Sequence, residues 1–221
     1  LQKKHDISVD EFSFLRGITE KPTKVTIPSP TMMSYYFVPG ISDKIYNPKE
    51  FLDEVTKILK ESISVLEQIG VTYIQIDAPE FGMLLDELQR DWFRAKGFNP
   101  DKLVSDGVEM INKVLEDFSG IKGLHICRGN DKNRFMAKGG YGEIAKTVFK
   151  KAKVDRLLLE FDSDRAGDFS PLVHVPKDKM VVLGLISTKT PKLEKVKDVS
   201  RRIGEAAKFV PIERLAISTQ C

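Results

Sequence analysis

The chain has 221 residues, of which 35 are basic and 32 are acidic, and its formal net charge is +3 at pH 7. This near balance, without a long basic run, argues against a nucleic-acid partner, and no apolar stretch approaches the roughly 18 to 20 residues that a membrane span needs. The two cysteines do not make a disulfide framework, so a reducing, cytoplasmic location is expected, while the oligomeric state is left open.

Apolar periodicity predicts strands that alternate with helices along the whole chain. One helix is expected to begin after Asn47, because Asn47, Pro48 and Glu50 are typical of a capped first turn, and to end at Gly70. The expected strands are 24–30, 72–77, 123–128, 156–161, 180–186 and 214–221, and the expected helices are 9–15, 48–69, 100–118, 141–153 and 193–209.

The loop 31–46 contains several large apolar side chains, among them Met32, Tyr35 and Tyr36. Loops are usually polar, so this loop is expected to lie against something. A pocket, a missing part of the chain and the loop's own domain are all candidates.

The strands predict an α/β fold with a parallel sheet. Runs such as Leu157-Leu158-Leu159 are apolar on both faces, which is typical of a parallel sheet covered on both sides. Six strands with helical crossovers fit either an open doubly wound sheet or most of an eight-stranded (β/α)8 TIM barrel, and no Gly-x-Gly-x-x-Gly motif follows a strand. Residues 1–221 are expected to form a single domain. Because the chain starts without Met and stops directly after a strand, a fragment of a longer protein is expected.

Polar side chains close most of the predicted strands, and in a β/α barrel the chemistry gathers at these strand ends. His125 and Cys127 are two residues apart in a strand and therefore point to the same face. Imidazole, thiolate and carboxylate groups are the ligands that zinc prefers, although a buried histidine beside a buried free cysteine is the plainer alternative. The residues concerned are Asp77, His125, Cys127, Glu160, Ser187 and Cys221.

The chain resembles the catalytic barrel of the cobalamin-independent methionine synthase family, within the superfamily that includes uroporphyrinogen decarboxylase. The resemblance covers nearly the whole chain and is strongest to the short, single-barrel branch. It implies that the six strands are strands three to eight of the barrel. The segments that carry it are 74–79, the His125-x-Cys127 pair with Arg128-Gly129-Asn130, 139–141, Leu159-Glu160, 165–169 and 218–221.

The resemblance implies a zinc-dependent methyltransferase of methionine biosynthesis, which transfers a methyl group to the thiol of homocysteine. It assigns the zinc ligands to His125, Cys127, Glu160 and Cys221. Glu160 is also the catalytic candidate, as the ligand that yields its place to the incoming sulfur. Asp77 is expected to hold the amino group of the substrate, with loop bracing or helix capping as its alternative.

Two further residues are candidates for substrate binding. Arg128 either binds a substrate carboxylate or braces its loop. Ser187 comes directly after the predicted strand 180–186. The charged loop that follows Glu160, with Asp162 and Arg165, is expected to be solvated.

One departure from the family concerns the methyl donor. Ile186 stands where the folate-using member has a proton-donating histidine, so folate, a corrinoid or another methyl source remains open. Transfer to another thiol such as coenzyme M is an alternative function. A non-catalytic barrel with a structural or lost metal site is another. A chain that lacks the first two strands is expected to be inactive by itself.

Overall fold

The computed structural model describes all residues from 1 to 221 and is built on one parallel sheet. The six strands pair in chain order, each with the next, so every connection is a crossover and β1 and β6 form the two edges. The predicted alternation of strands and helices is confirmed. The strands are β1 (Val25–Pro28), β2 (Tyr73–Asp77), β3 (Ile121–Ile126), β4 (Arg156–Glu160), β5 (Met180–Ile186) and β6 (Leu215–Thr219).

Seven α-helices connect or flank the strands. The expected cap of α2 is present, since the backbone N–H of Glu50 donates to Asn47 Oδ1 at 2.9 Å and that of Asn47 donates to Glu50 Oε2 at 3.0 Å. None of the helices combines the length and apolar character that crossing a membrane demands. The helices are α1 (Val9–Ile18), α2 (Pro48–Gln68), α3 (Pro79–Met83), α4 (Glu87–Ala95), α5 (Pro100–Val114), α6 (Gly142–Lys151) and α7 (Val196–Ala206).

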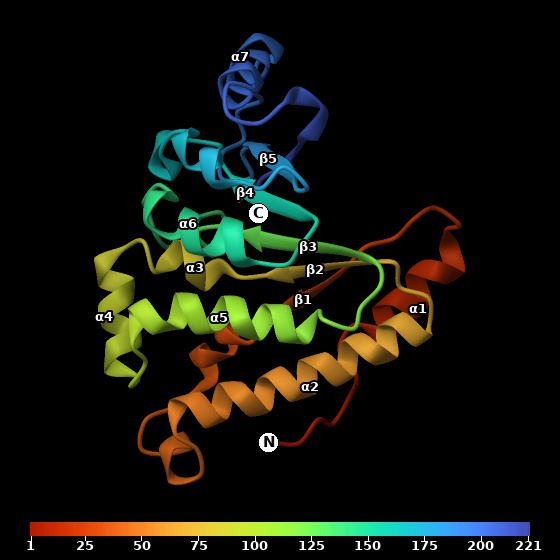
Figure 1. The fold of residues 1–221 in the computed structure, drawn as a ribbon, viewed down its shortest axis with the longest axis vertical. Coiled ribbons are helices and arrows are strands. Elements are labelled where there is room, and N and C mark those ends of the chain that lie inside the picture. Colours follow the sequence, from red (N-terminus) through yellow and green to blue (C-terminus); the bar gives the residue numbers. More distant parts are fainter.

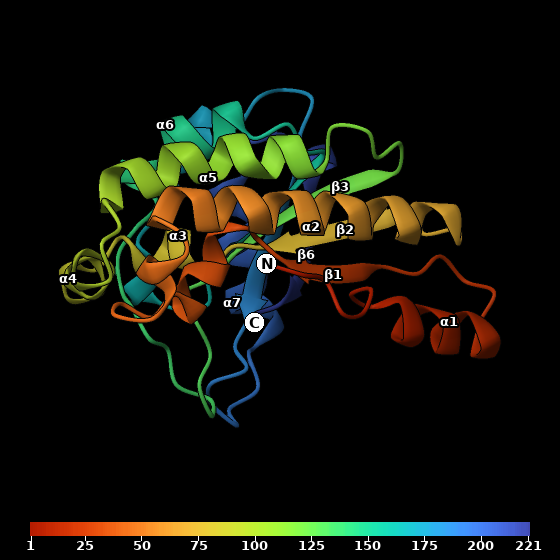
Figure 2. The same cartoon turned by 90° about the horizontal axis from the view of Figure 1, so that it is seen from below.

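The two faces of the sheet differ in cover. Helices α2, α5 and α6 lie side by side across one face (Figure 1), and Figure 2 shows α2 and α5 against the strands from a second direction. Strand residues on this face, such as Ile76, Leu124 and Leu157, are fully buried. The alternate residues, such as His125 and Leu158, are only partly buried. The apolar run around Leu158 predicts cover on both sides, whereas the second face is partly open: His125 and Leu158 line a cavity there.

Parallel pairing brings the carboxyl ends of the strands to one edge of the sheet. Asp77 at the end of β2 pairs with His125 on β3, and Glu160 at the end of β4 pairs with Gly184 on β5. Residues that are far apart in the sequence therefore meet at this edge, as the strand-end rule predicts.

Candidate metal centre and its cavity

Three of the four predicted metal ligands lie together at this edge. His125 lies on β3, Cys127 follows β3, and Cys221 follows β6, and their ligand atoms all lie within 4.8 Å of one another. Bonds of about 2.0–2.3 Å to zinc place tetrahedral ligands about 3.3–3.8 Å apart. The group is therefore close to the size that a zinc ion requires, and its donor set of two thiols and one imidazole fits that ion.

The ring of His125 is oriented by the neighbouring strand. Its Nδ1 lies 3.2 Å from the backbone carbonyl oxygen of Leu158, an acceptor only. This contact favours the tautomer with the proton on Nδ1, which leaves Nε2 free as a ligand atom.

Backbone and side-chain hydrogen bonds fix the position of Cys221. The backbone N–H of Gln220 donates to the carbonyl oxygen of Ile186 at 2.7 Å, which extends the β5–β6 pairing up to the cysteine. Asn130 Nδ2 donates to the carbonyl oxygen of Cys221 at 2.7 Å, and the hydroxyl of Thr188 donates to the same oxygen. The loop after β3 thus holds the last ligand against the first two.

The charges within the group favour one thiolate. Hydrogen bonds from Cys127 and His125 lower the pKa of Cys221 to about 4. The Cys221 thiolate, together with burial, raises the pKa of Cys127. Burial lowers the pKa of His125, but Cys221 and Asp77 outweigh this effect and the net change is upward. The second thiol is therefore hard to ionise without a cation, and a divalent ion would stabilise both thiolates.

Glu160, the fourth predicted ligand, is not part of this group. Its side chain is fully buried, with Oε2 accepting from the backbone N–H of Arg128 at 2.8 Å and Oε1 accepting from the guanidinium of Arg165. Asp162 also accepts from Arg165, at 2.8 Å, and its side chain has no exposed surface. The prediction of a solvated loop is wrong for Asp162 and Arg165, because these charges and that of Glu160 compensate one another inside the protein.

The structure gives Arg128 and Ser187 other partners than a substrate. The fully buried guanidinium of Arg128 donates to the carbonyl oxygen of Gly139 through Nε at 2.9 Å and Nη2 at 2.6 Å, and it stacks on the Tyr141 ring at 4.1 Å. Of its two predicted roles, loop bracing is the one that the geometry shows. Ser187 Oγ donates to Asp162 Oδ2 at 2.8 Å and lines a different cavity from the three ligands.

A cavity of about 480 Å³ opens above the three ligands. Asp77 lines it, and its Oδ1 accepts from Gln75 Nε2 at 2.7 Å, while Lys24 Nζ donates to Gln75 Oε1 at 2.6 Å. Burial raises the pKa of Asp77, and the nearby His125 partly offsets this. The rest of the wall is largely apolar and comes from Met32, Tyr35, Tyr36, Pro79, Met83 and Met136, together with Gly129 and Asn130.

Met32, Tyr35 and Tyr36 of the loop 31–46 thus line a pocket, while Phe37 packs on Phe51 and Phe98 of its own domain, so two of the three alternatives apply. Met83 and Met136 were not predicted as wall residues. Met83 closes the short helix α3, and Met136 lies in the irregular segment after β3, so neither belongs to a periodic pattern.

Comparisons with known proteins agree with this geometry. A family model described as "Cobalamin-independent synthase, Catalytic domain" matches residues 2–221. The uncharacterized protein YxjH of Bacillus subtilis is 36% identical over 97% of the chain, and the methionine synthase of Thermococcus kodakarensis is 26% identical over the whole chain. The chain spans 58% and 57% of the lengths of these two relatives.

Two solved structures share the fold. A B12-independent methionine synthase from Shewanella, in complex with selenomethionine, superposes with a TM-score of 0.74 at 25% identity, covering 100% of this chain and 61% of that one. A vitamin-B12-independent methionine synthase from Listeria monocytogenes gives 0.72 at 26% identity, covering 99% and 63%. The expected membership of the β/α-barrel class is confirmed.

Proposed function

Because the chain belongs to the cobalamin-independent methionine synthase family, we propose that it provides the zinc site at which a methyl group is transferred to the thiol of homocysteine. The product is methionine. The observation that carries this proposal is that His125, Cys127 and Cys221 lie together at the carboxyl ends of the strands. The cavity above them is also lined by Asp77.

The three ligands and Glu160 would hold the ion. When bound, zinc supplies Lewis-acid chemistry that lowers the pKa of a substrate thiol, so that a thiolate nucleophile exists at neutral pH. The contact between His125 Nδ1 and Leu158 leaves Nε2 free to bind an ion, and the hydrogen bonds to the Cys221 carbonyl keep that cysteine in place.

Asp77 is suited to hold the ammonium group of homocysteine through a charge-assisted hydrogen bond. The Lys24–Gln75 pair fixes the orientation of this carboxylate before substrate arrives. The apolar wall, with Met32 and Met83, keeps water away from the sulfur that accepts the methyl group. In the transfer, a new sulfur–carbon bond forms while the bond from carbon to the donor breaks, and the electron pair leaves with the donor.

Glu160 lies outside the three-ligand group, with its carboxylate paired to Arg165. It would complete the ligand set by giving up this partner. Because Arg165 stays available to it, Glu160 could give way to the substrate thiol without becoming an unpaired buried charge.

The test measures zinc content and methyl transfer on the full-length protein, with homocysteine and coenzyme M as acceptors and several methyl donors. The variant His125→Gln removes a ligand, and His174→Gln, at an exposed position, is its matched control. We expect about one zinc per chain and transfer to homocysteine, both lost in His125→Gln alone. Full activity without bound zinc, or in His125→Gln, would refute the proposal, and a preference for coenzyme M would correct the acceptor.

A further inference from the structure

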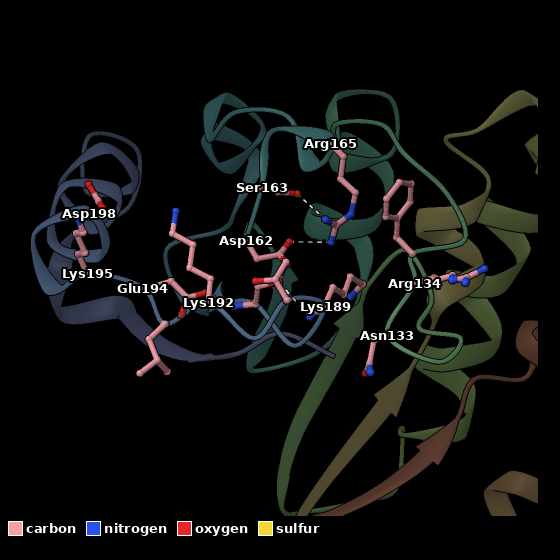
Figure 3. Close-up of a pocket in the computed structure, with 14 residues that line it drawn as sticks. Asn133, Arg134, Asp162, Ser163, Arg165, Lys189, Lys192, Glu194, Lys195 and Asp198 are labelled. Carbon is pink, nitrogen blue, oxygen red and sulfur yellow. Dashed lines mark hydrogen bonds and ion pairs between the residues drawn. The ribbon is translucent and has the colours of Figure 1, made fainter.

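A second cavity, of about 670 Å³, is lined by the residues that Figure 3 draws as sticks. Three segments form it: the loop around Asn133–Phe135, the turn at Asp162–Arg165 after β4, and the segment 187–195 after β5. Phe135 and Leu193 are its two apolar wall residues. It is therefore a polar cavity, unlike the apolar one above the cysteines.

The charge of the wall is positive. Arg165 already bonds to Asp162, at 2.8 Å, and none of the other four cationic residues forms an ion pair with any carboxylate. Among the acids, Asp162 also accepts from Ser187, and Glu194 accepts from the backbone N–H of Ser187 at 2.7 Å. The cationic residues are Arg134, Arg165, Lys189, Lys192 and Lys195, and the acidic ones are Asp162, Glu194 and Asp198.

Two cationic nitrogens of this wall are buried without a hydrogen-bond partner. These are Lys189 Nζ and Arg165 Nε. Figure 3 shows Lys189 on the side of segment 187–195 that faces the loop carrying Arg134. A buried ammonium without a partner is costly, and buried polar groups in native proteins nearly always have one. Both nitrogens belong to side chains that line the cavity, so a ligand there is the group that can satisfy them.

We propose that this basic cavity binds an oxyanion, either a carboxylate or a phosphate group, and that Lys189 is its main contact. The other end of the same molecule enters the cavity above the two cysteines, called the sulfur-lined cavity below. The binding of the anion rests on the basic cavity alone. Only its connection to chemistry at the cysteines rests on the proposed function.

The walls of the two cavities are in direct contact, so a molecule bound in one cavity can extend toward the other. Asn130 lines the sulfur-lined cavity and Asn133 lines the basic one, and the backbone N–H of Asn133 donates to Asn130 Oδ1 at 3.1 Å. Thr188, which precedes Lys189, donates to the carbonyl oxygen of Cys221. An anionic group held by Lys189 would therefore lie next to the reacting sulfur atoms.

Calorimetric titration with inorganic phosphate and with glutarate, at an ionic strength held constant with chloride, tests the proposal. We expect saturable binding of at least one probe, and the stronger one identifies the oxyanion. Lys189→Met removes the charge but keeps the stem, and it should weaken binding by roughly tenfold or more. Lys192→Met, at an exposed position of the same wall, is the matched control and should change affinity by less than about threefold.

Amide chemical shifts of the labelled wild-type protein give a second readout that does not depend on a variant that folds. The probe should move the signals of Ser163, Ser187 and Lys189. Absence of saturable binding above the chloride baseline, shifts elsewhere only, or equal affinity in Lys189→Met would overturn the proposal. Zinc content measured on the same samples separates the two hypotheses. Intact zinc without anion binding rejects only the basic cavity, and anion binding without zinc rejects only the proposed function.

Discussion

Glu80 is a carboxylic acid in the core, and replacing it with glutamine should change how stability depends on pH. The residue lies in α3 and is fully buried; its Oε1 accepts from the hydroxyls of Ser29 and Thr31, each at 2.6 Å, and its Oε2 has no partner. Burial raises the pKa of Glu80 from the ordinary 4.5 to about 7. The folded protein therefore keeps a proton on Glu80 at pH values where the unfolded chain has lost it.

The sign and the size follow from this difference. Between about pH 4.5 and 7 the folded state binds more protons than the unfolded state, so the free energy of unfolding falls as the pH rises. With about 1.4 kcal/mol for each pH unit, the total loss is about 3 kcal/mol, complete above pH 7 and absent below pH 4.5. Glu80→Gln keeps the acceptor oxygen but cannot ionise, so it should not show this loss.

Urea denaturation at a series of pH values from 4 to 8 measures the effect as the difference between wild type and Glu80→Gln. We expect the variant to gain about 3 kcal/mol relative to wild type across this range. Glu109→Gln, at an exposed position on α5, controls for the loss of one carboxylate. Parallel pH curves for wild type and Glu80→Gln would refute the assignment of a protonated buried acid.

Three further predictions concern the surroundings of the metal centre. Tyr141→Phe removes a hydroxyl that accepts from the backbone N–H of Glu160 at 2.8 Å, which should cost about 1–3 kcal/mol in urea denaturation; a loss below about 0.5 kcal/mol would contradict this. Gly82→Ala would place a methyl group 1.9 Å from the carbonyl oxygen of Cys127. This substitution should destabilise the protein by at least about 1–3 kcal/mol and weaken zinc binding. Unchanged zinc affinity would show that the loop adapts freely. Cys127→Ser should lower zinc affinity in a competition with a chromophoric chelator by at least about tenfold, and wild-type affinity would exclude the cysteine as a ligand.

The order of the strands and the position of the ligands were predictable because they depend on backbone rules. Apolar runs define the strands, parallel strands present their carboxyl ends at one edge, and residues two apart share a face. Together with the barrel that the resemblance implies, these rules place His125 and Cys127 beside Cys221, although 94 positions separate the two cysteines. They say nothing about the rotamer that a side chain adopts at a strand end.

The features that were not predicted depend on side-chain partners or on short elements. The ion pair of Arg165 with Glu160 is set by the conformation of an irregular turn, which no periodic pattern describes. Helix α4 was missed because it has only nine residues, most of them polar, and buries only Phe93 completely. Its start was nevertheless visible in Asp86, whose side chain accepts from the backbone N–H of Leu88 at 3.2 Å.

The placement of the two cysteines also bears on the order in which the protein becomes rigid. Any ion held by both Cys127 and Cys221 would cross-link the segment that runs from β3 to β6 and close a loop of about 94 residues. In the chain-entropy model, a covalent cross-link of that span raises the free energy of the unfolded chain by about 4–5 kcal/mol. Strand β6 must pack onto the sheet before this cross-link can form, so ion binding would indicate that the sheet is complete through β6. Removing the ion with a chelator would destabilise the C-terminal strands first.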